Sequence, residues 1–224
     1  MTDYSKLYPT RGDLAREQVR RHGLLYFGDV RQELHSRLSL LSPLARTAYA
    51  LACAERLMRY HEQLPASQRS DFTLTWRPVL ESMWAGLAGQ RPDILEQVQM
   101  ALDAFSTSPY NHDDGPEGPQ EADEDAAAAS ISAAQCYLSG EVQPADEAGS
   151  RAIEAAFRIA DDDLQLDPND FVWDPNAQPM PLAREAMHPA VQNALQLQLA
   201  DLTLLERHKI TPQLLNQLKR SNHP

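Results

Sequence analysis

Residues 42–63 read SPLARTAYALACAERLMRYHEQ, and this stretch decides the class of fold. Its apolar residues recur every three or four positions, the spacing that places side chains on one face of an α-helix. Serine before proline marks a helix start, because Ser accepts from free backbone amides and Pro fits the first turn. We therefore expect a long helix from Pro43 to about Gln63. It carries Leu44, Ala48, Leu51, Ala54 and Met58.

The same helical spacing continues on both sides of this stretch. Before it, Val30, Leu34, Leu38 and Leu41 share one helix face. After it, further helices are expected at about 79–89, 92–105, 121–139, 144–164, 191–205 and 211–218. We find no strand-length run that alternates apolar and polar residues between turn signals. The sequence predicts an all-α fold, a multi-helix bundle of about seven to eight helices that forms one domain over residues 1–224.

Two proline-rich, acidic segments interrupt the helices, at residues 106–120 and 165–181. Proline at this density stops both helix and sheet, and loops this long are usually functional or disordered. The two loops bracket an acidic helical hairpin made of residues 121–139 and 144–164. Residues 1–28 are expected to form a peripheral N-terminal arm, whose basic stretch fits a solvated amphipathic helix.

Charge is unevenly placed along the chain. The protein has 20 Lys and Arg against 32 Asp and Glu, a formal net charge of -12. Residues 101–180 hold 18 acidic and 2 basic residues, whereas the other 144 residues hold 14 acidic and 18 basic ones. A field of this sign repels phosphates, so nucleic acid is not expected as a partner. A basic protein is the better electrostatic match.

Cysteine usage and hydropathy are typical of a cytoplasmic protein. Cys53 and Cys136 lie among Ala and apolar residues, so we expect two reduced, buried thiols and no disulfide framework or zinc site. Residues 1–13 lack the apolar stretch of a secretion signal. No apolar run approaches the roughly 20 residues of a membrane span, so no membrane contact is expected.

The acidic clusters are the part of the sequence that could form a metal site or a catalytic site. The run at residues 161–163, continued by Asp167 and Asp170, has the density of a calcium loop. An EF-hand needs Gly at its sixth position and Glu at its twelfth, where this run has Leu166 and Val172. The sequence also lacks the HExxH, GxSxG, P-loop and GxGxxG motifs. We expect no metal, no cofactor and no catalytic residue, and a metal-dependent hydrolase is the least favoured hypothesis.

The segment Phe171-Val172-Trp173 places large apolar residues inside an acidic loop. Two interpretations stay open, because the aromatic rings either anchor the loop on the core or form an interface hot spot rimmed by charge. We expect partner contacts from both loops and from the adjoining helix ends. The candidate residues are Asp113, Asp114, Glu117, Glu121, Asp123, Glu124, Asp161, Asp162, Asp163, Asp167, Asp170, Phe171 and Trp173.

One part of the sequence resembles a known family. Residues 41–43 read LSP, Arg46 follows, and residues 50–57 read ALACAERL. This pattern resembles the LSP-x-x-R and CAERL signature of the YjaG-like proteins, an uncharacterised bacterial all-helical family. Residues 83–89, 124–127 and 155–156 extend the resemblance, which covers about residues 30–165. It implies an all-α fold and assigns no chemistry.

The polar members of this motif are Arg46, Glu55 and Arg56. We expect structural roles for them, either as ion pairs on a helix face or as donors that cap neighbouring carbonyl groups.

The length, helical pattern and acidity also resemble those of immunity proteins, which neutralise bacterial toxins such as those delivered by type VI secretion. The resemblance implies a cytoplasmic, non-enzymatic protein that binds a cognate toxin, most simply a nuclease, by occlusion or by disruption of its assembly. Nucleases present positive charge to phosphates, and a carboxylate-rich surface can occupy the same place. The alternative is a housekeeping helical adaptor of the YjaG-like kind, in which acidity serves solubility.

Overall fold

The computed structural model describes residues 10–90, 94–108, 121–165 and 181–221, with the backbone alone described at 121–124. Every regular element in these residues is helical, which confirms the all-α class. The described residues contain more helices than the seven to eight expected. The short helices η2 (Ala66–Gln68), α4 (Asp71–Thr75) and α9 (Pro181–Met187) were not predicted, because segments this short carry no repeated apolar stripe.

The centre of the fold is α3 (Pro43–Gln63), which begins and ends at the expected residues. The Ser42 side chain accepts a hydrogen bond from the Ala45 amide and so caps the helix. Buried residues occur all around α3, as in a helix that is enclosed by others. Leu44 is the exception to the expected stripe. It is 45 % exposed, because the buried face of the helix starts one residue later, at Ala45.

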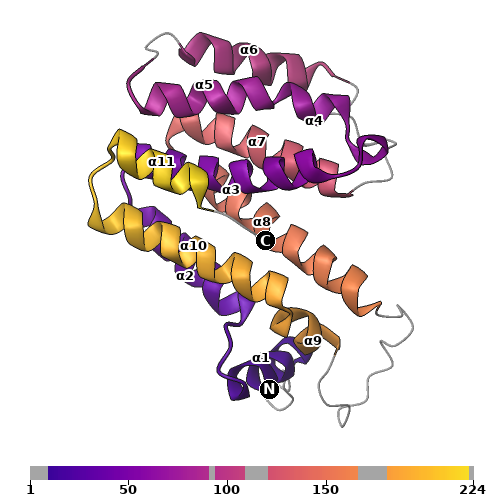
Figure 1. Ribbon diagram of the computed structural model, residues 1–224. Coiled ribbons are helices and arrows are strands. Elements are labelled where there is room, and N and C mark those ends of the chain that lie inside the picture. The colour runs from indigo at the N-terminus through magenta and orange to yellow at the C-terminus, as the bar shows by residue number, and fades with distance from the viewer. Residues whose placement is uncertain (1–9, 91–93, 109–120, 166–180, 222–224) are drawn as a thin grey trace, which may run out of the picture.

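The other long helices surround α3 (Figure 1). The predicted hairpin consists of α7 (Glu121–Ser139) and α8 (Val142–Leu164), and it packs directly on α3. On one side follow α5 (Arg77–Leu87) and α6 (Ile94–Ser106), and on the other α2 (Phe27–Leu40) and α10 (Pro189–Arg207). The last helix, α11 (Pro212–Arg220), lies against α3 and is capped by Thr211, as its sequence predicts. One continuous apolar core joins these helices.

The N-terminal stretch forms an amphipathic helix, as its sequence predicts. Within residues 10–28 the chain forms α1 (Arg11–Arg21), which starts at a capping box between Thr10 and Asp13. Two of its residues, Ala15 and Val19, are buried in a small second apolar cluster with Ala183 and Ala186 of α9. One face of α1 therefore packs on α9, which was not predicted, and the other face, which carries Arg11, Arg20 and Arg21, is exposed.

The α7–α8 turn shows how tightly the hairpin is fixed to α3. Gly140 has a φ of 67°, and a Cβ atom at this position would lie 2.6 Å from Pro43 Cβ at the start of α3. Glycine is needed both for its conformation and for this close approach. The following helix starts at Val142 instead of the expected Pro144. Proline is accepted there because the first amides of a helix have no partner within the helix.

Gly149 of α8 offers a test of this packing. An added Cβ would lie 2.5 Å from Tyr49 Oη and 3.0 Å from Gln198 Oε1, two buried atoms of α3 and α10. We expect Gly149→Ala to lower the free energy of unfolding by about 1–3 kcal/mol, because the three helices must move apart. Urea titration followed by circular dichroism measures this change. Gly12→Ala is the control, since its Cβ would meet nothing nearer than 3.4 Å, and unchanged stability in both variants would contradict the packing described here.

Candidate functional site

The antiparallel hairpin brings the first turns of α7 beside the last turns of α8. The contact is marked by an ion pair between Asp125 and Arg158, in which the Asp125 side chain is 2 % exposed. We call this region, residues 121–125 and 158–165, the acidic end of the hairpin. The chain enters α7 and leaves α8 here, so the two proline-rich segments are both joined to the hairpin at this end.

Three consecutive carboxylates, Asp161, Asp162 and Asp163, occupy the last turn of α8, and all three are exposed. No basic residue lies in that turn. The C-terminal end of a helix carries a partial negative charge, so carboxylates there are unfavourable. The described partner of this run is His188, whose Nε2 lies 3.5 Å from Asp163 Oδ2. Strong negative charge therefore remains at the surface, at a cost to the stability of the helix.

A groove of about 430 Å³ lies beside this turn, between α2, α8 and α9. Its apolar residues include Phe27 and Phe157, whose rings meet edge to face with centroids 5.1 Å apart. Asp161 and Glu185 lie on its rim. Burial, and then the negative charge of Asp161, raise the pKa of the Glu185 carboxyl. The groove thus combines two aromatic rings with two carboxylates.

The candidate contact residues divide into three groups. Asp161, Asp162 and Asp163 are exposed at the acidic end, as a surface role requires. Glu121, Asp123 and Glu124 lie in the first turns of α7, where the structure describes the backbone alone. Seven candidates fall outside the described residues, so both interpretations of the aromatic pair stay predictions. These are Asp113, Asp114, Glu117, Asp167, Asp170, Phe171 and Trp173.

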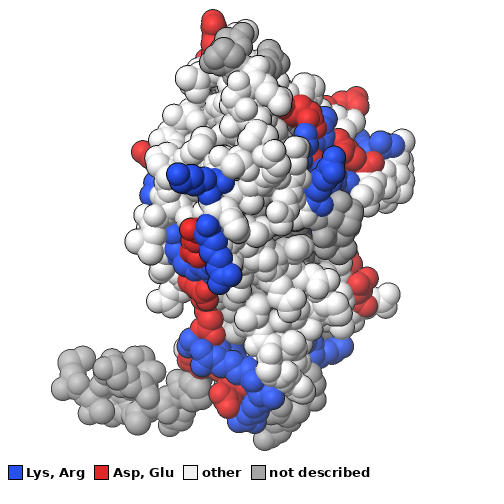
Figure 2. All heavy atoms as spheres, turned by 60° about the vertical axis from the view of Figure 1, so that its left-hand side comes forward, with Lys and Arg blue, Asp and Glu red and all other residues white. Residues whose placement is uncertain are grey.

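Elsewhere on the hairpin, some carboxylates lie beside basic side chains, whereas Glu141 and Glu147 are exposed. Asp146 lies 3.0 Å from the Nδ1 atom of His35, and Glu154 accepts from Arg151 at 3.2 Å. The face in Figure 2 likewise shows small groups of acidic and basic side chains side by side, with uncharged surface between them. The described surface is therefore not uniformly acidic, and three consecutive exposed carboxylates lie at the acidic end.

The polar motif residues of α3 hold the fold together, as expected. Arg46 donates to the carbonyl groups of Leu38, Ser39 and Gly140 at 2.9–3.0 Å and so ties together the ends of α2 and α7. The Glu55 side chain is 3 % exposed and accepts hydrogen bonds from three donors on α3 and α5. These are Arg59 Nε at 2.8 Å, Arg77 Nη1 at 2.9 Å and Trp84 Nε1 at 3.3 Å.

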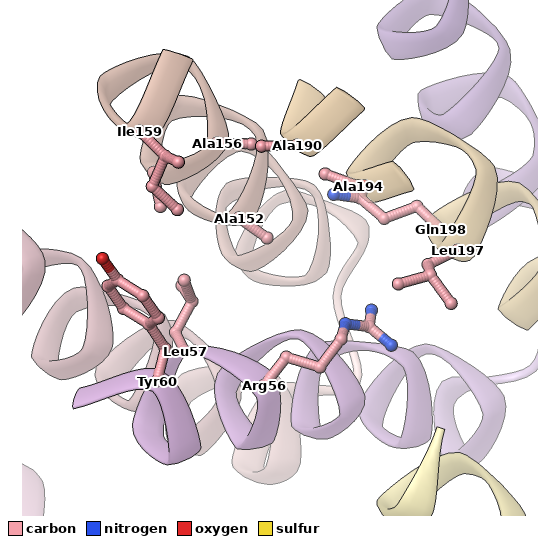
Figure 3. Close-up of a pocket in the computed structure, with 11 residues that line it drawn as sticks. Arg56, Leu57, Tyr60, Ala152, Ala156, Ile159, Ala190, Ala194, Leu197 and Gln198 are labelled. Carbon is pink, nitrogen blue, oxygen red and sulfur yellow. The ribbon is translucent and has the colours of Figure 1, made fainter. Parts of the chain in front are cut away.

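A second, smaller cavity of about 50 Å³ lies between α3, α8 and α10, beside Arg56 (Figure 3). Five of its eleven lining residues are alanines of α8 and α10, with Tyr60 and Leu57 on one side and Leu197 and Gln198 opposite. Two of the polar side chains at its edge, Arg56 and Gln198, are already engaged. Arg56 Nη1 donates to Asp201 Oδ2 at 2.6 Å, and Gln198 accepts from Tyr49 Oη at 2.6 Å. This cavity therefore presents apolar surface.

Protonation states around Arg56 are those of a structural core. Burial raises the pKa of Asp201, although the Arg56 guanidinium lowers it in part. Burial also raises the pKa of the Cys53 thiol to about 11, so this thiol stays protonated and is a poor nucleophile. Both cysteines are buried and free, as predicted. Within the described residues, no group of three or more His, Cys, Asp or Glu side chains is placed to hold a metal ion.

Hydropathy gives one further finding. In the part of the chain that the structure describes, none of the helices combines the length and the apolar character needed to cross a membrane.

Comparison with known proteins adds a fold relationship. No protein-family model matches the chain. No curated protein matches it either. Among solved structures, it is similar to a DUF416 family protein from Shewanella baltica OS155, with a TM-score of 0.57, 16% sequence identity, and coverage of 83% of this chain and 91% of that one. At this identity the likeness shows a shared fold, which is compatible with the resemblance to an uncharacterised bacterial family.

The Arg56–Asp201 pair can be tested by comparing the unfolding free energies of three variants. Arg56→Met leaves the Asp201 carboxylate, which is 2 % exposed, without its cation, and we expect a loss of about 3–5 kcal/mol of unfolding free energy. The double variant Arg56→Met/Asp201→Leu should be more stable than Arg56→Met, since the buried charge is gone. Arg151→Met, in an exposed pair, is the control and should cost under about 1 kcal/mol. Urea titration measures all three, and a double variant less stable than Arg56→Met would refute the buried-charge account.

Glu185 predicts a pH dependence of stability. Its pKa is raised in the folded protein, so the folded state holds this proton more tightly than the unfolded state. The stabilising effect of the group is fully present below the ordinary pKa of 4.5 and is lost as pH rises through the raised value. We therefore expect Glu185→Gln to be more stable than the unchanged protein at pH 7, with the difference shrinking toward pH 4. Thermal unfolding at a series of pH values measures this, and a difference independent of pH would contradict it.

Proposed function

We propose that this protein is a non-enzymatic binding protein that captures a positively charged protein at the acidic end of the α7–α8 hairpin. The observation that carries the proposal is the exposed run of Asp161, Asp162 and Asp163 in the last turn of α8. These carboxylates oppose the helix dipole, and residues that lower stability are typical of functional positions. The groove beside them supplies the apolar surface that an interface also needs.

The partner class follows from the sign of the charge. A basic protein, most simply a nuclease toxin delivered by type VI secretion, would be drawn to this end by long-range attraction and held there by close charge pairs. The protein would then act in the cytoplasm as an immunity protein, without contact to nucleic acid or membrane. Binding rather than catalysis is supported by the engagement of Glu55, Arg56 and Asp201 in contacts between helices.

A second candidate function is a helical adaptor in a YjaG-like family. It is favoured by the fold shared with an uncharacterised DUF416 family protein. The two candidates differ in what the partner does to the cell. If the captured protein is a toxin, its expression alone stops growth and coexpression with this protein restores it. An adaptor would capture a partner whose expression is harmless.

Charge reversal at the acidic end tests the proposed site. We expect Asp162→Lys/Asp163→Lys to reduce capture of the basic partner at least about tenfold, a change of roughly 1.4 kcal/mol in binding free energy. The same variant should unfold at a higher temperature, because each cation at a helix C-terminus stabilises by about 0.3–1 kcal/mol. Affinity purification from the native bacterium and quantitative mass spectrometry measure capture, and circular dichroism measures the melting temperature.

The matched control is Glu141→Lys/Glu147→Lys, which makes the same change of charge at the opposite end of the hairpin, also on exposed residues. Capture should stay within about twofold of that by the unchanged protein, and raised salt should weaken it in both. Equal losses in the two variants, or capture that survives reversal at the acidic end, would show that this end is not the binding site.

A further inference from the structure

The groove between α2, α8 and α9 has the features of a binding site for a helix. Its apolar residues come from all three helices and include Phe27, Phe157 and Leu182. The volume of about 430 Å³ is within the range of sites that bind small molecules or the buried side chains of a partner. An extended peptide binds by adding to a sheet edge, whereas a groove between helices receives the apolar face of another helix. The elements that form this groove are all helices.

Charge at the rim limits what can bind. Asp161 and Glu185 both line the groove, and burial and then the negative charge of Asp161 raise the pKa of the Glu185 carboxyl. A lysine or arginine placed between them would remove this repulsion and gain two charge-assisted hydrogen bonds. A phosphate or carboxylate at the same place would be repelled.

Three other charged residues also line the groove. Arg158 is matched by Asp125 of α7, and Glu154 is matched by Arg151. Arg31 of α2 remains as an exposed cation on the rim. Arg31 would repel a ligand whose only charges are positive. A ligand that places an acidic or amide side chain near Arg31 therefore fits better.

We propose that the groove receives an amphipathic helix of the partner protein, with apolar side chains on Phe27, Phe157 and Leu182 and a lysine or arginine between Asp161 and Glu185. This inference rests on the proposed function, because it requires a basic protein partner. It adds the chemistry of the contact, since charge draws the partner in and the aromatic floor supplies most of the binding energy.

The test uses a fluorescein-labelled synthetic helix of about 18 residues, built from Leu and Lys with one apolar face and one internal Glu. A peptide of the same composition, scrambled so that Leu and Lys no longer segregate, separates helix geometry from charge. Fluorescence anisotropy with the full chain measures both affinities. We expect the amphipathic peptide to bind at least about tenfold more tightly than the scrambled one.

Two changes block the groove in different ways. Ser150→Trp fills it from a half-buried position on α8 without altering charge, and Asp161→Asn/Glu185→Gln removes the carboxylate pair. Each should weaken peptide binding, and capture of the native partner, at least about tenfold. The matched controls are Gln143→Trp on the exposed face of α8 and Asp146→Asn/Glu147→Gln at the opposite end of the hairpin. The two control variants should change the affinity for the peptide and the partner by less than about twofold. Circular dichroism should show unchanged helicity in all four variants.

Each contrary outcome has a separate meaning. In one outcome, Ser150→Trp leaves both peptide and partner binding intact while Asp162→Lys/Asp163→Lys abolishes capture. The groove is then not the binding site, and the proposed function stands. If neither change affects capture, the proposed function fails as well. The inference is also overturned by preferred binding of a labelled single-stranded oligonucleotide. Self-association of the protein that Ser150→Trp abolishes would overturn it too, since a second copy would then occupy the groove.

Discussion

The arrangement of the helices depends on two adjacent buried ions of α3, Glu55 and Arg56. Neighbouring residues on a helix point about 100° apart, so each side chain meets a different partner helix. Glu55 pairs with Arg77 of α5, and Arg56 pairs with Asp201 of α10. An unpaired charge at either buried position would cost several kcal/mol, so α5 and α10 must take these places around α3. An apolar core alone would allow helices to slide or rotate.

This constraint reaches the candidate site through a chain of contacts. Tyr49 of α3 donates to Gln198 of α10, and the Gln198 amide donates to the Gly149 carbonyl of α8 at 2.9 Å. These contacts tie α8 to α3 and α10 at Gly149. Because α7 returns antiparallel and is held by the Asp125–Arg158 pair, the acidic end has a defined place beside α9 and α2. The groove lies between these elements.

Much of the fold could be predicted because its signals are local. Ser42 before Pro43 marks a cap, and Gly140 marks a helix end, in the sequence as in the structure. The groove could not be predicted, because α2, α8 and α9 supply its residues and no local pattern links Phe27 to Glu185. The sequence contained the acidic run at residues 161–163. It did not reveal which other carboxylates have basic partners, since pairs such as Arg37–Glu206 join distant segments.

The placement of carboxylates along α8 bears on whether the acidity serves solubility or the binding of a basic partner. If carboxylates served solubility alone, their place along the helix would matter little, and the N-terminal half, where the dipole favours them, would be the better place. Asp146 and Glu147 lie in that half, and Asp146 also has His35 as a partner. At the opposite end, Asp161, Asp162 and Asp163 accumulate against the dipole, and Asp161 further raises the pKa of Glu185. A basic partner would relieve both costs at once, and solubility explains neither.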